Sequence, residues 1–454
     1  METPPRPHNP YSVLLVVGLG ALMSTLDGSV VNISLPTIVK AFGASMESAE
    51  WVVMAYLLVL ASLLVSFGRA GDLFGHRRVY LLGFVVFGSA SFFCGAARSM
   101  PGLIAARAAQ ALGGSMLQAV SIALVTVAFP AAKRGRAVGL VSLFTYTGLA
   151  IGPSLGGWLT GHFGWRSIFY VNLPVAALAL SLGVWLLPRS VKRADAKLDL
   201  PGSALWAATL VFLLVGLARA QEWGLASART AAMLAASAAL YAVFVRVELR
   251  RDKPMLDLRL FLNPAFTGGV VAALMNYLAV SAIAFLTPFA LVQALGLETP
   301  RAGLLMSSMA VLMAICSPLS GALSDRIGWR APAVAGMALL AGGEVLLRFA
   351  ETPASFAIAL AVCGFGTGIF ISPNTSAVMG ATPPERLGTA SGVIGTARTA
   401  GMVLGVAASG LALAAAGTVE GADAAARLHA FRWGLTPGLV ACVIGAAAAL
   451  LRPA

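Results

Sequence analysis

Four ionisable residues fall inside long apolar segments, where charge is costly and therefore informative. They are Asp27, Arg107, Glu344 and Arg398, whereas most other charges lie in polar turns. An acid at bilayer depth costs about 2.5–3.5 kcal/mol on insertion scales, so it faces a cavity or a partner and tends to be functional. A carboxylate whose protonation depends on which side is open to water can couple proton movement to transport. Asp27 is therefore a candidate proton-binding group.

The two buried arginines leave alternatives open. Arg107 lies at a depth similar to Asp27, so the pair is either a static ion pair or a participant in proton transfer. Arg398 has no acid near it in the sequence. It binds Glu344, a backbone carbonyl or an anionic group of a substrate, and the residues alone do not choose between these.

The loop GRAGDLFGHRR, residues 68–78, has the composition of a conformational latch. Gly68 and Gly75 suit a tight turn between two helices, and Asp72 suits the N-terminus of a neighbouring helix. Arg77 and Arg78 favour the cytoplasmic side of a membrane. A merely basic loop is the simpler alternative, but it would not require the aspartate.

A glycine run lies in the fifth apolar segment. Gly148, Gly152, Gly156 and Gly157 give small faces that let helices approach closely, and Pro153 interrupts the backbone hydrogen-bond ladder. The pattern suits a hinge between two moving halves, and a packing role fits the same spacing.

Polar and aromatic residues in the middle of apolar segments are candidates for contacting a transported molecule. Each is equally consistent with ordinary helix packing. Methionine and phenylalanine would supply an adaptable apolar lining. The candidates are Asn32, Tyr56, Gln110, Gln118, Tyr146, Asn276, Tyr277, Met306, Asn374 and Arg398, with Met275, Phe285 and Phe370 as further apolar members.

Motifs for other chemistry are missing from the sequence. No lysine follows a glycine, so there is no GxxxxGK[ST] loop for ATP, and no GxGxxG opens a helix after a strand. The four histidines and four cysteines are dispersed, which predicts neither a metal site nor a disulfide. An intramembrane enzyme would need a nucleophile beside a base, and none is found. We expect no cofactor, no metal and no enzymatic activity.

The elements that position these residues are predicted from composition. Of 454 residues, 59% are hydrophobic and only 11% are charged, against about 25% charged in an ordinary globular domain, which excludes a soluble enzyme. Fourteen apolar segments are long enough to cross a bilayer as helices. They are expected at 11–34, 49–67, 79–97, 101–128, 137–160, 166–187, 201–219, 229–248, 264–292, 302–323, 331–349, 354–380, 387–416 and 431–451.

The net charge of +13 is explained by membrane orientation rather than by nucleic acid. With the N-terminus inside, 20 of the 31 Lys and Arg residues fall in cytoplasmic segments and 9 in outer ones. We therefore expect a multi-pass protein of the cytoplasmic (inner) membrane with both termini cytoplasmic. Its expected partners are the bilayer, a small-molecule substrate and protons; no segment indicates an adaptor protein. The first segment, residues 11–35, is too long for a signal peptide and is expected to remain as a helix.

An internal repeat organises the chain. Gly68, Asp72, Gly75 and Arg77 recur 253 positions later as Gly321, Asp325, Gly328 and Arg330. Gly139, Gly148 and Gly152 recur at the same offset as Gly392, Gly401 and Gly405. Parallel repeats of six spans are the build of one large class of secondary transporters. We expect six-helix bundles at 1–187 and 264–454, with a linker carrying two extra helices at 188–263.

These motifs resemble the fourteen-span drug:proton antiporter branch of the major facilitator superfamily. LDGSVVNISLPTI (26–38) is similar to the signature of that branch, with Asp27 at its acidic position. Residues 68–78 resemble the superfamily's loop between helices two and three, and Arg107 with Gln110 fits its helix-four motif. Residues 148–157 match the helix-five antiporter motif, and WRSIFYVNLP (165–174) is typical of the fourteen-span branch. The resemblance covers essentially the whole chain.

The resemblance implies an all-α membrane protein of fourteen helices that exports amphipathic drugs or antibiotics in exchange for protons by alternating access. It implies that Asp27 is the proton or substrate carboxylate, that Arg107 is its relay partner, and that Asp72, Arg77 and Arg78 form a gate. The chain departs from the pattern at Leu73, Ser29 and Ser34. Export of a lipid or of one endogenous metabolite on the same fold is the alternative.

Overall fold

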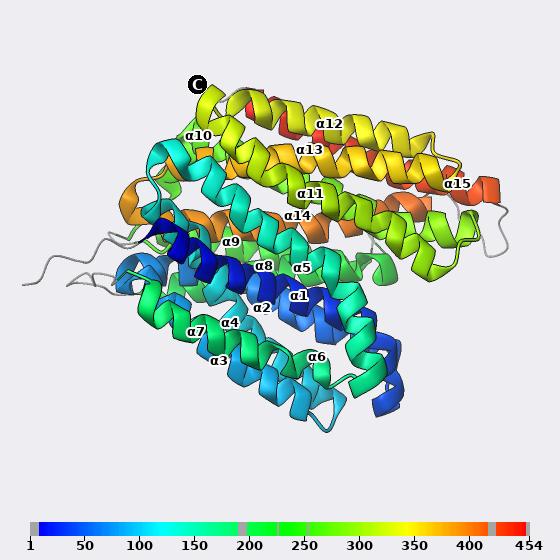
Figure 1. Cartoon of the computed structure of the whole chain (residues 1–454), viewed down its shortest axis with the longest axis horizontal. Coiled ribbons are helices and arrows are strands. Elements are labelled where there is room, and N and C mark those ends of the chain that lie inside the picture. Colours follow the sequence, from blue (N-terminus) through cyan, green and yellow to red (C-terminus); the bar gives the residue numbers. More distant parts are fainter. Residues whose placement is uncertain (1–8, 189–197, 225–226, 252–253, 416–423, 451–454) are drawn as a thin grey trace, which may run out of the picture.

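The computed structural model describes residues 9–188, 198–224, 227–251, 254–415 and 424–450. Within these ranges the regular elements are helices (Figure 1). The basic residues expected to mark the cytoplasmic side at Arg189, Lys192, Arg193, Lys197 and Lys253 lie outside the described residues. The α-helices are α1 (Pro10–Phe42), α2 (Met46–Phe74), α3 (His76–Ala96), α4 (Met100–Ala128), α5 (Arg134–Phe163), α6 (Ser167–Tyr170), α7 (Asn172–Leu186), α8 (Leu200–Trp223), α9 (Ala228–Leu249), α10 (Pro264–Pro288), α11 (Thr299–Ile327), α12 (Arg330–Arg348), α13 (Pro353–Gly380), α14 (Leu387–Ala415), α15 (Ala424–Gly434) and α16 (Thr436–Leu450).

Fourteen helical spans in the described part of the chain are long and apolar enough to cross a membrane. Each corresponds to one of the segments expected from the sequence, and α6 with α7 and α15 with α16 each make one span. The all-α membrane architecture is therefore confirmed.

The loop at 68–78 is shorter than its composition indicated. α2 continues to Phe74 and α3 begins at His76, so Gly75 alone breaks the helix, with φ of 100°. Between α11 and α12 the break spans two residues, Gly328, with φ of 84°, and Trp329. Because only glycine adopts this conformation without strain, one residue is enough to reverse the chain, and the polar residues before it stay helical. Gly68 and Asp72 therefore lie on a helix and not in a loop.

The helices form two groups with an additional pair beside them. We call α1–α7 the N-half and α10–α16 the C-half. In Figure 1 α3, α6 and α7 lie on one side and α12, α13 and α10 on the other, with α5, α11 and α14 between. The two groups meet where α5 packs along α11 and α2 packs along α14. The end where α1 begins and α16 ends is here called the terminal face.

Separate cores hold the groups together. Rings of Tyr80, Phe84 and Phe87 are buried in the N-half, and Phe356 and Phe370 are buried in the C-half. α8 pairs with α9 and lies against α2 and α14. A further cluster joins this pair to both halves through residues that include Phe244, Val65, Phe266 and Ala390.

Candidate functional site

Asp72, near the end of α2, caps the first turn of α14 in the opposite half. Its carboxylate accepts hydrogen bonds from the backbone N–H groups of Gly388 at 2.7 Å and Thr389 at 2.8 Å, and from the Thr389 hydroxyl at 2.7 Å. The first N–H groups of a helix lack partners within the helix, and the helix dipole there favours a negative charge. His76, one turn later, lies 3.1 Å from the same carboxylate.

Asp325 makes the equivalent contact from the C-half. Its carboxylate accepts hydrogen bonds from the N–H groups of Gly135 at 2.8 Å and Arg136 at 2.9 Å, in the first turn of α5. Each aspartate thus bridges the two halves at the terminal face. The sequence indicated an acid that caps a neighbouring helix, and the structure identifies which helix.

Glycines let the helix backbones touch at both caps. A Cβ atom added to Gly68 would clash with the carbonyl of Gly388, and one added to Gly321 would clash with the carbonyl of Gly135. Ser372 of α13 also donates to the Gly135 carbonyl at 2.6 Å. The two halves are therefore in close backbone contact at the terminal face.

The arginines of the same motif bind within their own half, whereas the aspartates bind the opposite half. Arg77 donates to the carbonyl of Val184, near the end of α7, at 2.6 Å. Arg330 donates to the carbonyl of Leu450, at the end of α16. Both bonds stay within one half and place a cation at a helix C-terminus, where the dipole favours it. Arg78 is exposed.

Asp27 and Arg107 form a buried ion pair in the interior of the N-half. Arg107 Nη1 lies 2.6 Å from Asp27 Oδ2, and each residue is 1% exposed. Arg107 also donates to the carbonyl of Val52 at 3.3 Å, and its guanidinium lies 4.3 Å from the ring centre of Tyr56. Buried pairs are tolerated only when further hydrogen bonds satisfy both partners, as they do here.

Three amide and hydroxyl side chains complete this cluster. Asp27 Oδ1 accepts from Gln110 at 2.9 Å and from Asn172 at 2.7 Å, and Gln110 in turn donates to Ser91 at 2.8 Å. Asn172 and Ser91 were not singled out from the sequence. Asn172 lies within the segment 165–174, so a buried amide at the start of α7 was a signal that could have identified it.

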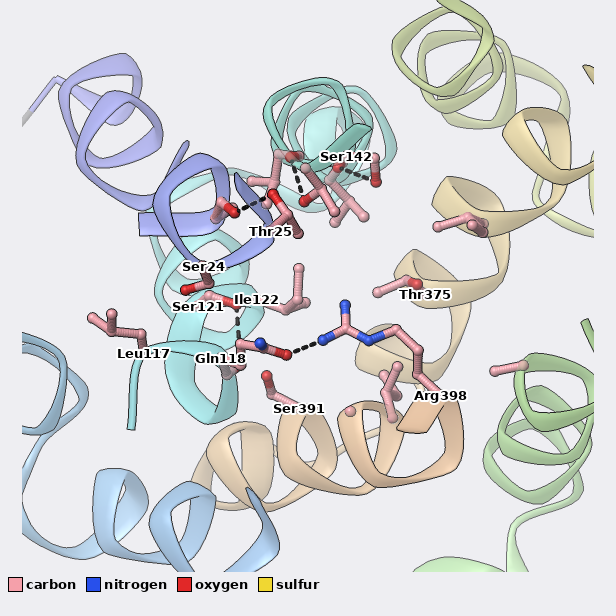
Figure 2. Close-up of a pocket in the computed structure, with 18 of the residues that line it drawn as sticks. Ser24, Thr25, Leu117, Gln118, Ser121, Ile122, Ser142, Thr375, Ser391 and Arg398 are labelled. Carbon is pink, nitrogen blue, oxygen red and sulfur yellow. Dashed lines mark hydrogen bonds between the residues drawn. The ribbon is translucent and has the colours of Figure 1, made fainter. Parts of the chain in front are cut away.

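A separate cavity lies between the two halves. Figure 2 shows Arg398 of α14 extending across it to donate to Gln118 of α4, with hydroxyl groups of Ser24, Thr25 and Ser391 nearby. It is lined by Gly20, Ala21, Ser24, Thr25, Tyr80, Leu117, Gln118, Ser121, Ile122, Val138, Val141, Ser142, Thr145, Tyr146, Ala273, Tyr277, Phe370, Ile371, Asn374, Thr375, Ser391, Ile394, Gly395 and Arg398. Among the described residues that line this cavity, none is acidic and Arg398 alone is charged.

The structure brings some of the expected lining residues to this cavity and places others elsewhere. Gln118, Tyr146, Tyr277, Asn374, Arg398 and Phe370 line it. The partner of Arg398 is Gln118, an acceptor that was not among the alternatives considered from the sequence. Glu344 does not pair with Arg398.

The remaining candidates lie outside the cavity lining. Tyr56 and Gln110 surround the Asp27 pair, and Asn32 is exposed on α1. Asn276 is buried and donates to the Met337 sulfur at 3.5 Å. Met306, Met275 and Phe285 were expected to give the cavity an adaptable apolar lining, but their side chains face the interior of the C-half instead. Met306 and Phe285 pack against the C-half core, and Met275 lies beside Gly445 of α16.

The glycine run of α5 faces α1, which belongs to the same half. Added Cβ atoms at Gly148, Gly152 and Gly156 would meet Thr25, Ser29 and Val30 of α1. Gly157 has nothing within 4 Å of that position. Pro153 is exposed, and α5 continues through it. Contact between α5 and the C-half instead involves the α5 N-terminal part, at Gly135 and Gly139.

Comparisons with known proteins agree with this architecture. The family model described as Major Facilitator Superfamily matches residues 17–406 and 269–454. The multidrug resistance protein Stp of Mycobacterium tuberculosis is 37% identical over 88% of this chain and 75% of that protein. The riboflavin transporter RibZ of Clostridioides difficile is 35% identical over 87% of each chain.

Solved structures show the same fold. The crystal structure of the human organic anion transporter MFSD10 (TETRAN) superposes with a TM-score of 0.69 and 18% identity, covering 98% of this chain and 100% of that one. The relatives are transporters and not enzymes, and the fold is a multi-pass membrane fold. The chain therefore belongs to the Major Facilitator Superfamily and is a membrane transporter.

Proposed function

We propose that this transporter exports amphipathic compounds across the cytoplasmic membrane in exchange for protons, by alternating access. The observation that carries the proposal is the Asp27 cluster, a buried carboxylate held by Arg107, Gln110 and Asn172 inside the N-half. A carboxylate that loses its charge on binding a proton also loses its attraction to Arg107, which frees the arginine for other acceptors. Protonation would thus repack the N-half core beside the cavity.

The terminal face is proposed to be cytoplasmic, because the sequence's Lys and Arg residues concentrate in the segments at this end. With that face held shut by Asp72 and Asp325, the described conformation is closed toward the cytoplasm. We propose that residues 1–187 and 264–454 move as two bundles about the cavity, and that residues 188–263 carry the extra pair. The gate is then the pair of aspartate caps rather than the arginines.

The cavity favours compounds without a net positive charge. Arg398 repels cations, and no carboxylate of the lining attracts them. Aromatic rings of Tyr146, Tyr277 and Phe370 offer stacking surface, and several hydroxyl groups offer hydrogen bonds. We therefore propose neutral or anionic aromatic compounds as the preferred substrates.

Export of one endogenous metabolite is the second candidate. It is favoured by the similarity to RibZ, which is named a riboflavin transporter. Riboflavin is a neutral compound that combines an aromatic ring system with hydroxyl groups. A transporter dedicated to one such compound would move riboflavin-like molecules and ignore unrelated dyes.

Proton flux in inverted membrane vesicles tests both candidates. The vesicles are energised until their interior is acidic, and then riboflavin, anionic fluorescein or cationic ethidium is added. We expect riboflavin or fluorescein to release protons from the interior, and a protonophore to abolish uptake of the dye. Asp27→Asn should lose this exchange, whereas Glu50→Gln, at an exposed acid of α2, should retain it. Uptake of dye that continues unchanged in Asp27→Asn would refute the proton-coupling role.

A further inference from the structure

Glu344 of α12 is a fully buried carboxyl that the proposed function does not use. The residue is 0% exposed, and neither of its carboxyl oxygens has a hydrogen-bond partner among the described residues. Its oxygens face Gly438 of α16, where an added Cβ would clash with Oε1 and lie 3.0 Å from Oε2. The absence of a side chain at Gly438 therefore provides the space that the carboxyl occupies.

The position of Glu344 corresponds to the Asp27 cluster of the N-half. At the repeat offset of 253, Ser91 corresponds to Glu344 and Gln110 to Cys363. The packing verifies this register, because Gly113 meets the backbone of Phe87 just as Gly366 meets that of Leu340. Glu344 thus occupies the place of the serine that receives the hydrogen bond from Gln110.

The Asp27–Arg107 pair itself has no charged counterpart in the C-half. Ser29 of α1 lies against Gly152 of α5, and Ser281 of α10 lies against Gly405 of α14 in the same way. These equivalent contacts align α1 with α10 at 252 positions (281 minus 29), one fewer than the offset of the other helices. This register places Ala279 where the N-half has Asp27, and Leu360 stands where it has Arg107. Among the described residues, each half therefore buries a carboxyl at this level, but in the N-half alone a cation forms an ion pair with it.

The surroundings of Glu344 favour a neutral carboxyl. The titratable side chains that act on it are Arg348, one turn along α12, Cys363 of α13 and Cys442 of α16. Arg348 is half-buried and does not come within 4 Å to form an ion pair, and both cysteines are free thiols. An ionised carboxylate buried without a cation or a hydrogen-bond donor is strongly disfavoured, whereas its protonated form carries no charge.

We propose that Glu344 is a second proton-binding carboxyl, neutral in the conformation described here and located in the C-half opposite Asp27. The inference rests on the proposed proton-coupled function. When the C-half helices rearrange, Glu344 gains access to water on the cytoplasmic side and releases its proton to that water; on return it takes up another proton from water on the outer side. The transport cycle then carries one proton through each half.

The protonation state is tested on the purified full-length protein without any substrate. The infrared spectrum of the parent protein should contain the carbonyl stretch of a protonated carboxyl. This stretch should be missing from the spectrum of Glu344→Gln, so that it stands out in the difference between the two spectra. The stretch should persist in Glu351→Gln, which alters an exposed acid of the same region whose side chain is 69% exposed. An infrared band that is unchanged by Glu344→Gln would overturn the proposal.

A second measurement uses the unmodified chain, in case the variant does not fold. Dicyclohexylcarbodiimide, which reacts with protonated carboxyls in apolar surroundings, should label Glu344, as located by mass spectrometry of peptides, and should label it less as the pH is raised. Absence of label at Glu344 while other buried carboxyls react would also overturn the proposal.

The role in transport is tested separately from the protonation state. In proteoliposomes, the number of protons exchanged per dye follows from the dye gradient that balances an imposed pH gradient. The measurement uses a compound that the parent protein transports, chosen from riboflavin, fluorescein and ethidium. Glu344→Gln should exchange one proton fewer per molecule of this compound, and Glu351→Gln should exchange the same number as the parent. An equal ratio in Glu344→Gln would refute the transport role. If the parent moves no protons with any dye, the proposed function fails, whereas the infrared and labelling results still report on Glu344.

Discussion

Asp72 and Asp325 stand 253 residues apart, and each caps a helix of the half to which it does not belong. The helices they cap, α14 and α5, are themselves related by the same offset, since Gly135 and Gly388 are the first capped residues. The closed terminal face is thus built from two copies of one interaction. Because both contacts cross the interface, both must break before the halves separate at this face.

Asp72→Ala and Asp325→Ala should each weaken this closure. Loss of a carboxylate cap costs about 0.5–2 kcal/mol, and here the loss affects the closed conformation alone. We expect each variant to increase the population that is open at the terminal face, and the double variant to increase it further. Distances between spin labels on α2 and α14 would report the change. Glu351→Ala, at an exposed acid that pairs with Arg432 at 3.0 Å beyond the opposite end of α12, is the control and should leave the distances unchanged.

Removing Arg107 should destabilise the protein more than removing both charges of its pair. Arg107→Ala leaves Asp27 buried without a cation, a change that costs about 3–5 kcal/mol in buried pairs. In the double variant Asp27→Asn with Arg107→Ala the uncompensated charge is gone, so much of the stability should return. Thermal unfolding in detergent measures both. Equal losses in the single and double variants would contradict a paired, charged state of Asp27.

The glycines of α5 should differ sharply in their tolerance of alanine. Gly148→Ala and Gly152→Ala drive a Cβ into α1, and overpacking of this kind costs about 1–3 kcal/mol. Gly157→Ala meets nothing within 4 Å and replaces a poor helix former, so a gain of up to about 1 kcal/mol is expected. Melting temperatures of the three variants provide the comparison. A hinge at Gly157 would instead show as lost transport with unchanged stability.

Arg398 should set the charge preference of the cavity. Arg398→Gln removes its one cation, and Arg398→Glu reverses it. We expect fluorescein transport to fall in both variants and ethidium transport to rise in Arg398→Glu, because the cavity charge then attracts cations. Gln118→Ala removes the hydrogen-bond partner without changing charge and should alter affinity with little change in preference. The same order of preference in all variants would exclude Arg398 from substrate selection.

Membrane spans and the internal repeat could be predicted from the sequence. Fourteen apolar segments are a local property, because a helix in lipid must satisfy its backbone within itself and needs only length and hydropathy to be recognised. The offset of 253 between Asp72 and Asp325 is likewise readable without coordinates. Even the capping chemistry was predictable, since an aspartate beside small residues suits a helix N-terminus.

Partners of the buried polar residues were decided only by the tertiary structure. Asp27 and Arg107 are 80 positions apart in the sequence, and nothing in their spacing shows that Asn172 joins them or that the cluster lies outside the lining of the central cavity. Likewise the sequence could not assign Gln118 to Arg398 or leave Glu344 unpaired. Hydropathy fixes how deep a residue lies along its helix, but the rotation of each helix about its own axis is set by packing against its neighbours, and that rotation determines which side chains meet.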